Sequence, residues 1–241
     1  MGNIKGKIAL VTGASAGIGE KTARALFEAG ARVICSARRT KRLEKIVEEL
    51  GEGAVALELD VTSNQSTETL LDRLPNEWRD IDILVNNAGH DIGGRRLFHE
   101  GTSQGWSAII ETNVIGLMRV TQAVLEGMVR RDSGHIVNIG SIAGVQTSPL
   151  CAAYSASKHA VHGFSETLRL DYGNTGIKIS EVLPGIVKTE FATTRFDDED
   201  FGICLEPEDI ARSVMFVLDQ PTDVVIAQVL VLPSSRKIKP V

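Results

Sequence analysis

Short apolar runs alternate with longer amphipathic segments along the whole chain, and this alternation restricts the possible folds more than any other feature. Strands are predicted for the apolar runs Lys7–Thr12, Ala31–Ala37, Ala54–Leu59, Ile81–Asn86, His135–Ile139, Lys178–Leu183 and Val224–Leu232. Helices are predicted for Ile18–Ala29, Lys41–Leu50, Ser66–Leu74, Trp106–Arg131, Ala153–Tyr172 and Pro207–Leu218. Because strands that are apolar on both faces must be covered on both sides, the pattern predicts one α/β domain: a doubly wound parallel sheet of seven strands with helices on both faces.

The composition of the 241 residues excludes several classes of protein. Hydrophobic residues make up 43% and charged residues 24%, which is typical of a soluble globular domain. Acidic residues outnumber basic ones, 31 to 26, so neither nucleic acid nor a membrane surface is an expected partner. Cys35, Cys151 and Cys204 have no metal-binding spacing, and no apolar run reaches the ~18 residues of a membrane span. We expect a cytoplasmic protein without a bound metal ion.

A glycine-rich turn links the first predicted strand to the first predicted helix. From Thr12 to Gly19 it reads Thr-Gly-Ala-Ser-Ala-Gly-Ile-Gly. Glycines let the backbone approach a pyrophosphate closely, and the following helix offers free N–H groups to that anion. Cofactor contacts are therefore predicted for Gly13, Ser15, Gly17, Ile18 and Gly19. A purely structural turn is the alternative, whereas a phosphate-loop NTPase is disfavoured because Glu20 stands where that loop needs glycine.

The end of the second predicted strand indicates which dinucleotide would bind. An acidic residue there would bond the ribose 2′-hydroxyl of NAD, but the chain reads Ser36-Ala37-Arg38-Arg39. Guanidinium groups make charge-assisted bonds to phosphate. The sequence therefore predicts NADP(H), with Arg38 as the main contact to the 2′-phosphate and Arg39 stacking or supporting it. The alternative is that both arginines begin a charged, solvated helix face.

Tyr154 and Lys158 stand four residues apart, which places them on one face of a predicted helix. A phenol has an ordinary pKa of about 10, and a neighbouring ammonium favours the phenolate and lowers that pKa. Tyr154 would then exchange a proton with a carbonyl or alcohol oxygen, which Ser141 would also hydrogen-bond. A pair of this kind is common on helix surfaces, so its meaning depends on the other motifs.

Together the motifs resemble those of the short-chain dehydrogenase/reductase family, in the same order and over nearly the whole chain. They are Thr12–Gly19, Asn86–Gly89, Asn113, Ser141, Tyr154 with Lys158, and Pro184-Gly185. The resemblance implies a Rossmann-type fold and an NADP-dependent oxidoreductase that acts on CH–OH groups.

The resemblance also implies roles for individual residues. Tyr154 would be the acid–base, Lys158 would tune it and bind the nicotinamide ribose, and Ser141 would orient the substrate oxygen. Asn113 would hold a water in a proton relay through Lys158. Further cofactor contacts are implied for Asp60 and Val61 at the adenine, Asn87, Ala88 and Gly89 in the cleft, and Pro184, Gly185, Val187 and Thr189 at the nicotinamide.

Two segments resemble the NADP-dependent 3-hydroxy acid (serine) dehydrogenase branch of the family. They are Leu74–Val85 and Thr189–Phe191 with the following Arg195-Phe196. Enzymes of this branch oxidise small 3-hydroxy acids or reduce the matching semialdehydes, and relatives reduce sulfoacetaldehyde. An anionic substrate needs a cation, which Arg195 would supply beside Ser141 and Tyr154. Arg95 and Arg96 are further candidates, and each of the three arginines could instead be a surface residue.

Two other functions remain open on the sequence. One is a carbonyl reductase for bulkier neutral ketones, and the other is a non-catalytic sensor that binds the dinucleotide. A sensor would not need Ser141, Tyr154 or Lys158, so their presence favours turnover.

Family analogy predicts a homotetramer, or at least a dimer, whose interface uses the helices that contain Val114–Val124 and Ala152–Ala160. Among the loop residues, His90 and His99 are expected to be solvated, with a place in the cleft as the alternative. Cys151 is expected to be a small packed thiol, with a substrate contact as the alternative.

Overall fold

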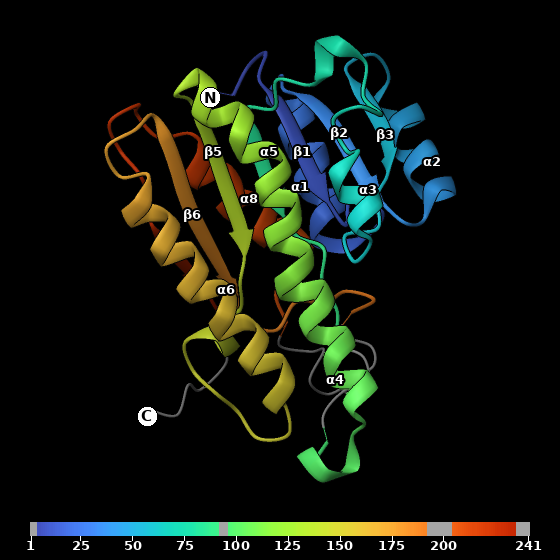
Figure 1. Cartoon of the computed structure of the whole chain (residues 1–241), viewed down its shortest axis with the longest axis vertical. Helices are drawn as coiled ribbons and strands as arrows, with labels where there is room; N and C mark the ends of the chain where they lie inside the picture. Colours follow the sequence, from blue (N-terminus) through green and yellow to red (C-terminus); the bar gives the residue numbers. More distant parts are fainter. Residues whose placement is uncertain (1–3, 92–95, 192–203, 235–241) are drawn as a thin grey trace.

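Seven parallel strands form one sheet in the part of the chain that the computed structural model describes, residues 4–91, 96–191 and 204–234. In chain order they are β1 (Ile8–Thr12), β2 (Arg32–Ala37), β3 (Ala54–Glu58), β4 (Ile83–Asn86), β5 (Gly134–Ile139), β6 (Ile177–Pro184) and β7 (Gln228–Val231). Their spatial order is β3-β2-β1-β4-β5-β6-β7 (Figure 1). Because the order reverses between β1 and β4, a crevice opens at the carboxyl ends of these neighbouring strands. The predicted fold class is confirmed.

Helices cover both faces of the sheet (Figure 1). One layer contains α1 (Gly17–Glu28), α2 (Thr40–Leu50) and α8 (Pro207–Leu218), and the other contains α3 (Asn64–Glu68), α5 (Leu117–Arg131) and α6 (Ala152–Asp171). The alternation along β1 supplies both cores. Ala9 and Val11 pack in the cluster with α1 and α8, whereas Ile8 and Leu10 pack in the cluster with α5.

A π-helical turn, η3 (Glu111–Gly116), interrupts the long helix that the sequence predicts at Trp106–Arg131. It joins α4 (Ser103–Ile110) to α5. Turns of this type occur frequently at functional sites, and Asn113 lies in this one with 1% of its surface exposed. The remaining short helices of the described residues are the 3-10 turns η1 (Asn76–Trp78), η2 (Phe98–Glu100) and η4 (Ile142–Gly144).

The combined stretch Ser103–Arg131 is, among the described residues, the one helical segment long and apolar enough to cross a membrane by length and composition. Its inner side packs on the sheet through Val120, Val124 and Met128, which are at most 2% exposed. A core helix passes the same test of length and composition, and packing against the sheet is the role that this segment has here.

The last strand is shorter than the sequence predicts, because β7 begins at Gln228 instead of Val224. The carbonyl oxygens of Val224 and Ile226 accept hydrogen bonds from the side chains of Lys178 (2.8 Å) and Ser180 (2.7 Å) on β6. These side chains take the place of backbone partners, so the ladder between β6 and β7 starts only at Gln228.

The third helix also has other bounds than the predicted Ser66–Leu74. The Ser63 side chain accepts a hydrogen bond from the backbone N–H of Ser66 and so caps α3 earlier in the chain. After α3, the Arg73 guanidinium donates to the carbonyl oxygens of Glu58 and Ser66. The chain therefore continues as turns that stay close to the end of β3.

Candidate active site

A cavity of about 820 Å³ lies at the carboxyl ends of the central strands. Most predicted site residues line it: Gly13, Ser15, Gly17, Ile18, Arg38, Arg39, Asp60, Val61, Asn87, Ala88, Gly89, Ser141, Tyr154, Lys158, Pro184, Gly185, Val187 and Thr189. Gly19 and Asn113 are not among the lining residues, and Arg95 and Arg195 lie outside the described residues. Residues from both halves of the chain thus meet in one cavity.

The glycine turn after β1 needs glycine for conformation and for space. Gly13 and Gly17 have φ angles of +67° and +57°, in the left-handed region that favours glycine. A Cβ atom on Gly13 would lie 2.8 Å from Nδ2 of Asn87, and one on Gly17 would lie 3.1 Å from Cγ2 of Thr189. Gly19 serves packing, since a Cβ there would lie 2.5 Å from the carbonyl oxygen of Gly13.

The amino end of α1 points out of this turn without a side-chain cap. Its N-cap residue is Ala16, which has no side chain that could bond the first N–H groups of the helix. Uncapped N–H groups and the positive end of the helix dipole form a site for an anion. Because Ala16, Gly17 and Ile18 all line the cavity, this end of α1 is open to a ligand there.

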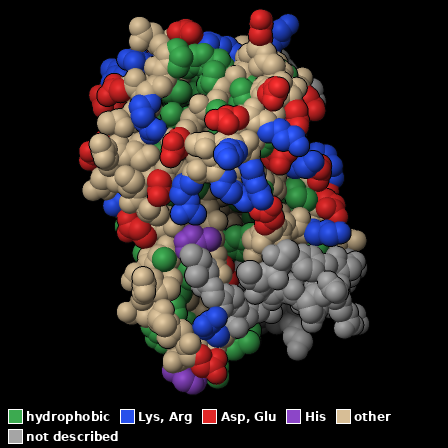
Figure 2. Space-filling model, turned by 90° about the vertical axis from the view of Figure 1, so that its right-hand side faces the viewer, with side chains coloured by type: hydrophobic (Ala, Val, Ile, Leu, Met, Phe, Trp, Pro, Cys, Tyr) green, Lys and Arg blue, Asp and Glu red, His purple; other side chains and the backbone are tan. Residues whose placement is uncertain are grey.

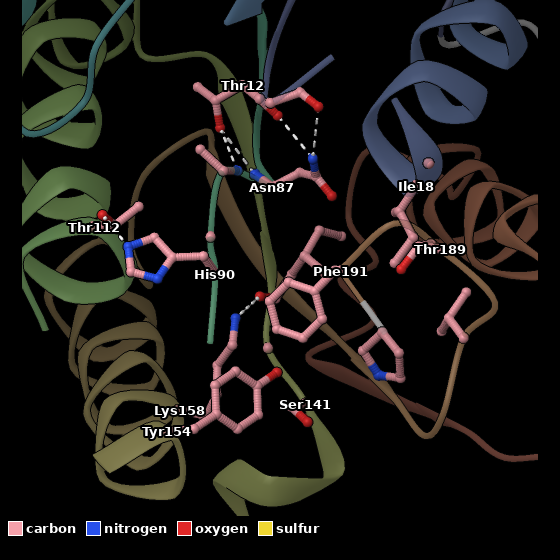
Figure 3. A pocket seen from close by; sticks show the side chains of 18 of the residues that line it. Thr12, Ile18, Asn87, His90, Thr112, Ser141, Tyr154, Lys158, Thr189 and Phe191 are labelled. Atoms are coloured by element: carbon pink, nitrogen blue, oxygen red, sulfur yellow. Dashed lines mark hydrogen bonds between the residues drawn. The ribbon is translucent and has the colours of Figure 1, made fainter. Parts of the chain in front are cut away.

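A network around Thr12 fixes the floor of the cavity (Figure 3). The Thr12 hydroxyl accepts hydrogen bonds from the backbone N–H groups of Asn87 (2.9 Å) and Ala88 (3.0 Å). The Asn87 side-chain amide donates to the Thr12 carbonyl oxygen at 2.9 Å. These bonds join the ends of β1 and β4 at the point where the strand order reverses, and they hold the two walls of the crevice at a fixed spacing.

Two exposed arginines border the cavity at the end of β2. The Nε atom of Arg39 donates to the Ser15 hydroxyl at 3.0 Å, whereas the Arg38 guanidinium makes no hydrogen bond or ion pair within the described residues. Burial raises the pKa of the Asp60 carboxyl, but hydrogen bonds from Thr62 and the charge of Arg38 outweigh it, so that this pKa lies below its usual value. On the face in Figure 2, lysine and arginine side chains gather near the middle, interleaved with acidic ones.

Tyr154, Lys158 and Ser141 meet at the other end of the cavity (Figure 3). The first two project from α6, and Ser141 follows β5; all three are buried, with 6 to 8% of their surface exposed. The Lys158 ammonium donates to the carbonyl oxygen of Ile139 at 2.8 Å and lies 5.9 Å from the centre of the Tyr154 ring. The Ser141 hydroxyl accepts from the N–H of Ala143 at 3.1 Å, which fixes its orientation. A phenol, an ammonium and a hydroxyl thus face one cavity.

The family model described as short chain dehydrogenase matches residues 7–200. The chain belongs to the short-chain dehydrogenase family. It is 43% identical over 238 residues to an NADP-dependent 3-hydroxy acid dehydrogenase of Salmonella typhi, with 95% of this chain and 96% of the relative covered. The protein of the same name from Escherichia coli K12 is 40% identical with the same coverage.

Solved structures of dehydrogenases have the same fold as this chain. The closed form of a serine dehydrogenase complexed with NADP⁺ superposes with a TM-score of 0.91 at 38% identity, covering 97% of both chains. An alcohol dehydrogenase from Thermococcus sibiricus complexed with 5-hydroxy-NADP has a TM-score of 0.89 at 28% identity, covering 98% of this chain and 100% of the other.

In this short-chain dehydrogenase, Asn113 lies one layer behind the cavity. Its Oδ1 accepts from the backbone N–H of His90 at 2.9 Å, and its Nδ2 donates to the His90 carbonyl oxygen (3.0 Å) and to the Ser157 hydroxyl (3.1 Å). Ser157 in turn donates to the carbonyl oxygen of Tyr154 at 2.7 Å. The side chain therefore ties the π-helical turn to the end of β4 and to α6; the water relay stays a prediction.

His90 is not a solvated loop residue, contrary to the expectation from the sequence. It is half-buried, lines the cavity, and shares a hydrogen bond of 2.9 Å between Nε2 and the Thr112 hydroxyl (Figure 3). Burial, and then the charge of Arg38, lower the pKa of its imidazole. The neutral ring therefore packs beside the cavity at neutral pH, whereas His99 is exposed as expected.

Sequence reasoning missed two charged residues near the cavity: Glu190, which lines it, and Arg42, which contacts Glu190 from outside the lining. The Glu190 carboxylate accepts one hydrogen bond from Arg39 and one from Arg42, each at 2.7 Å. The three-residue spacing of the two arginines places them on one side of α2, which the sequence could reveal. No local signal connects them with an acidic residue that follows β6.

A smaller pocket of about 160 Å³ lies beside Tyr154 and is lined by Asp91, Arg96, Trp106, Leu150 and Cys151 among others. Arg96 is exposed, and its backbone N–H donates to the Leu150 carbonyl oxygen at 2.9 Å. Cys151 is 4% exposed and packs near Tyr154, in agreement with the expected packed thiol. Within residues 4–91, 96–191 and 204–234, no group of three or more metal-ligating side chains could hold a metal ion.

Proposed function

We propose that this chain is an NADP(H)-dependent oxidoreductase that interconverts a short 3-hydroxy acid and its carbonyl counterpart. The observation that carries the proposal is one cavity that contains both a dinucleotide-type glycine turn and the buried set Ser141, Tyr154 and Lys158. The family match and the 43% identity to an NADP-dependent 3-hydroxy acid dehydrogenase support it.

The cavity fits an NADP-type cofactor on the chemistry of its lining. The glycine turn and the uncapped end of α1 would hold the pyrophosphate, since Gly13 and Gly17 leave no side chain in the way. Arg38 and Arg39 would hold the 2′-phosphate, because guanidinium groups bond phosphate in pairs of charge-assisted contacts. When bound, the nicotinamide supplies or accepts the hydride.

The chain's own residues handle the proton. Tyr154 would give its phenolic proton to the substrate carbonyl oxygen in reduction, and would take it back in oxidation. The ammonium of Lys158, held by the Ile139 carbonyl oxygen, would stabilise the phenolate form of Tyr154. Ser141, oriented by its bond with Ala143, would donate to the same substrate oxygen.

The names of similar proteins support a hydroxy acid substrate more directly than the pocket does. A relative at 43% identity and a solved structure at 38% identity are named for 3-hydroxy acids and for serine respectively. The matching semialdehydes, or the anionic aldehyde sulfoacetaldehyde, would be the substrates for reduction. Arg96 lines the smaller pocket together with Tyr154, so its guanidinium would bind the carboxylate of the substrate. Arg195 stays a candidate for the same role, as the sequence predicts.

Neutral ketones form the second candidate class. The favouring observation is apolar lining near Tyr154: the Phe191 ring lies 5.8 Å from the Tyr154 ring, and Ile142, Ala143 and Pro149 also line the cavity. A sensor without chemistry is disfavoured, since dinucleotide binding alone does not require an acid–base phenol with the Ser141 hydroxyl beside it in the cavity.

We also propose that the protein is cytoplasmic and forms a homotetramer, or at least a dimer. The exposed side of α6 carries the small residues Ala152, Ala156, Ala160 and Gly163, which would let a helix of a second copy approach closely. Nothing lies within 4 Å of a Cβ built on Gly163. Light scattering at micromolar concentration tests the proposal: a tetramer or dimer supports it, and a monomer contradicts it.

The test of the function is turnover of a panel of substrates, measured through the near-ultraviolet absorbance of the reduced cofactor. The panel contains short 3-hydroxy acids including serine, the semialdehydes, and bulkier neutral ketones. Faster turnover of the acids or semialdehydes supports the proposal, whereas faster turnover of the ketones favours the second class. Tight NADPH binding without any turnover would favour the sensor.

A further inference from the structure

The carboxylate of Glu190 pairs with two arginines: Arg39, the residue just before α2, and Arg42, in the first turn of α2. Its Oε2 accepts from Nη1 of Arg39 and its Oε1 from Nη1 of Arg42, each at 2.7 Å. Arg39 is held on its other side by Ser15 in the glycine turn, at 3.0 Å from Nε to Oγ. Four side chains thus form a chain of polar contacts from the glycine turn, across the start of α2, to the segment after β6.

The two neighbours of Glu190 in the chain contact different ends of the cavity through their side chains. Thr189 lies against the glycine turn, where a Cβ on Gly17 would be 3.1 Å from its Cγ2. Phe191 packs on the catalytic tyrosine, with 5.8 Å between the ring centres. Thr189, Glu190 and Phe191 all line the cavity, as does Arg39, whereas Arg42 does not. Glu190 follows β6, which lies on the β4 side of the crevice, whereas its two arginine partners follow β2, which lies on the β1 side.

We propose that Glu190, Arg39 and Arg42 form a clasp that closes over a bound dinucleotide and slows its release. The inference rests on the proposed function, which assigns this cavity to NADP(H). Because the ion pairs join segments from the two sides of the crevice, opening them would widen the way out for a ligand that occupies the cavity. Arg42 serves the clasp and not the ligand, because it does not line the cavity.

The strength of the clasp follows from its exposure. The side chains of Arg39, Arg42 and Glu190 are 47%, 49% and 59% exposed, so water screens both ion pairs. Hydrogen bonds from Arg39 and then from Arg42 hold the pKa of Glu190 below its usual value, and the clasp therefore stays charged at neutral pH. Exposed pairs of this kind are weak individually, so we expect loss of the clasp to speed release by about twofold to about tenfold. A weak clasp can also open during every catalytic cycle.

The test is the dissociation rate of NADPH, measured by stopped-flow fluorescence when excess NADP⁺ displaces it from the wild type and from Arg42→Gln. The expected result is dissociation about twofold to about tenfold faster in Arg42→Gln. Lys45→Gln is the matched control, because it removes a positive charge from the same helix without contacting Glu190, and it should dissociate at the wild-type rate. Equal rates in the wild type and Arg42→Gln would overturn the clasp.

A second arm uses NADH, which lacks the 2′-phosphate. A clasp acts on any dinucleotide in the cavity, so Arg42→Gln should speed NADH release by a similar factor. A change confined to NADPH would show that Arg42 contacts the 2′-phosphate directly, and it would overturn the clasp. In the double variant Arg42→Gln with Glu190→Gln, release should be no faster than in Glu190→Gln alone, because both substitutions remove the same pair.

These measurements separate the clasp from the proposed function. Wild-type turnover of hydroxy acids with unchanged release from Arg42→Gln contradicts the clasp alone. Faster release from Arg42→Gln, without turnover of any substrate by the wild type, supports the clasp and contradicts the proposed function.

Discussion

The ammonium of Lys158 on α6 donates a hydrogen bond to the carbonyl oxygen of Ile139 at the end of β5, at 2.8 Å. The bond spans two elements and fixes a buried positive charge 5.9 Å from the centre of the Tyr154 ring. This position is the one that the proposed role of Lys158 requires, because a positive charge beside a phenol favours the phenolate.

Replacing this charge should change the pH dependence of the reaction. In Lys158→Met, the phenol of Tyr154 loses the neighbouring ammonium that favours its phenolate, so the acid-side limb, over which the rate of alcohol oxidation rises with pH, should move to higher pH. We expect kcat at neutral pH to fall by about 10²-fold or more, as for the loss of a general acid–base. Lys158→Arg keeps a charge and should keep more of the activity; a pH profile identical in wild type and Lys158→Met would contradict this role.

Arg38 should distinguish the two dinucleotides. Removing the guanidinium in Arg38→Ala removes a charged hydrogen-bonding partner of the 2′-phosphate, for which about 1.5–3 kcal/mol is typical. The KM for NADPH should rise by about tenfold to about a hundredfold, and the KM for NADH should change little. Lys41→Ala is a control for loss of charge at the same end of α2. A wild type that prefers NAD(H) would contradict the assignment.

The glycine turn should reject a methyl group for two separable reasons. Gly13→Ala introduces backbone strain at φ +67° and a Cβ at 2.8 Å from the Asn87 amide, so it should lower Tm and abolish NADPH binding. Gly51→Ala has the same kind of strain at φ +80° but no atom within 4 Å of its Cβ. It should lower Tm and retain NADPH binding; NADPH affinity in Gly13→Ala equal to that of Gly51→Ala would refute the close approach.

His135 should make the fold sensitive to acid. Burial, and then the charge of Lys178, lower its pKa from 6.5 to about 3, and the ring shares a hydrogen bond of 2.9 Å with Ser180. Below pH 6.5 His135 becomes protonated in the unfolded chain, but in the folded chain it stays neutral down to about pH 3. The free energy of unfolding therefore decreases as the pH is lowered through this window, by up to about 1.4 kcal/mol per pH unit. Urea unfolding at several pH values should give a shallower dependence for His135→Gln, and an unchanged dependence would exclude this cause.

The sequence was sufficient for the features that depend on local pattern. Apolar runs such as Ile8–Thr12 define the strands, and the glycine turn and the spacing of Tyr154 and Lys158 depend on neighbouring residues. These features therefore predict the sheet and the position of the cavity at its carboxyl edge. The structure places most of the glycine turn, Tyr154 and Lys158 in the cavity at this edge.

Features that depend on distant contacts could not be predicted. The shorter β7 results from side chains of Lys178 and Ser180 that take its carbonyl oxygens, and the burial of His90 depends on Thr112 and Asn113 in a π-helical turn. Glu190 is 151 residues from Arg39 along the chain. Nothing in the sequence around any of these residues indicates its partner.

The most direct test of the account is single-turnover hydride transfer in Tyr154→Phe, measured beside NADPH affinity in the same protein. Removing only the hydroxyl leaves the ring that packs beside Phe191, so NADPH should bind with the affinity of the wild type. The account predicts a loss of hydride transfer of about 10²-fold or more at every pH. Transfer at the wild-type rate in Tyr154→Phe would contradict the central claim that this phenol carries the proton.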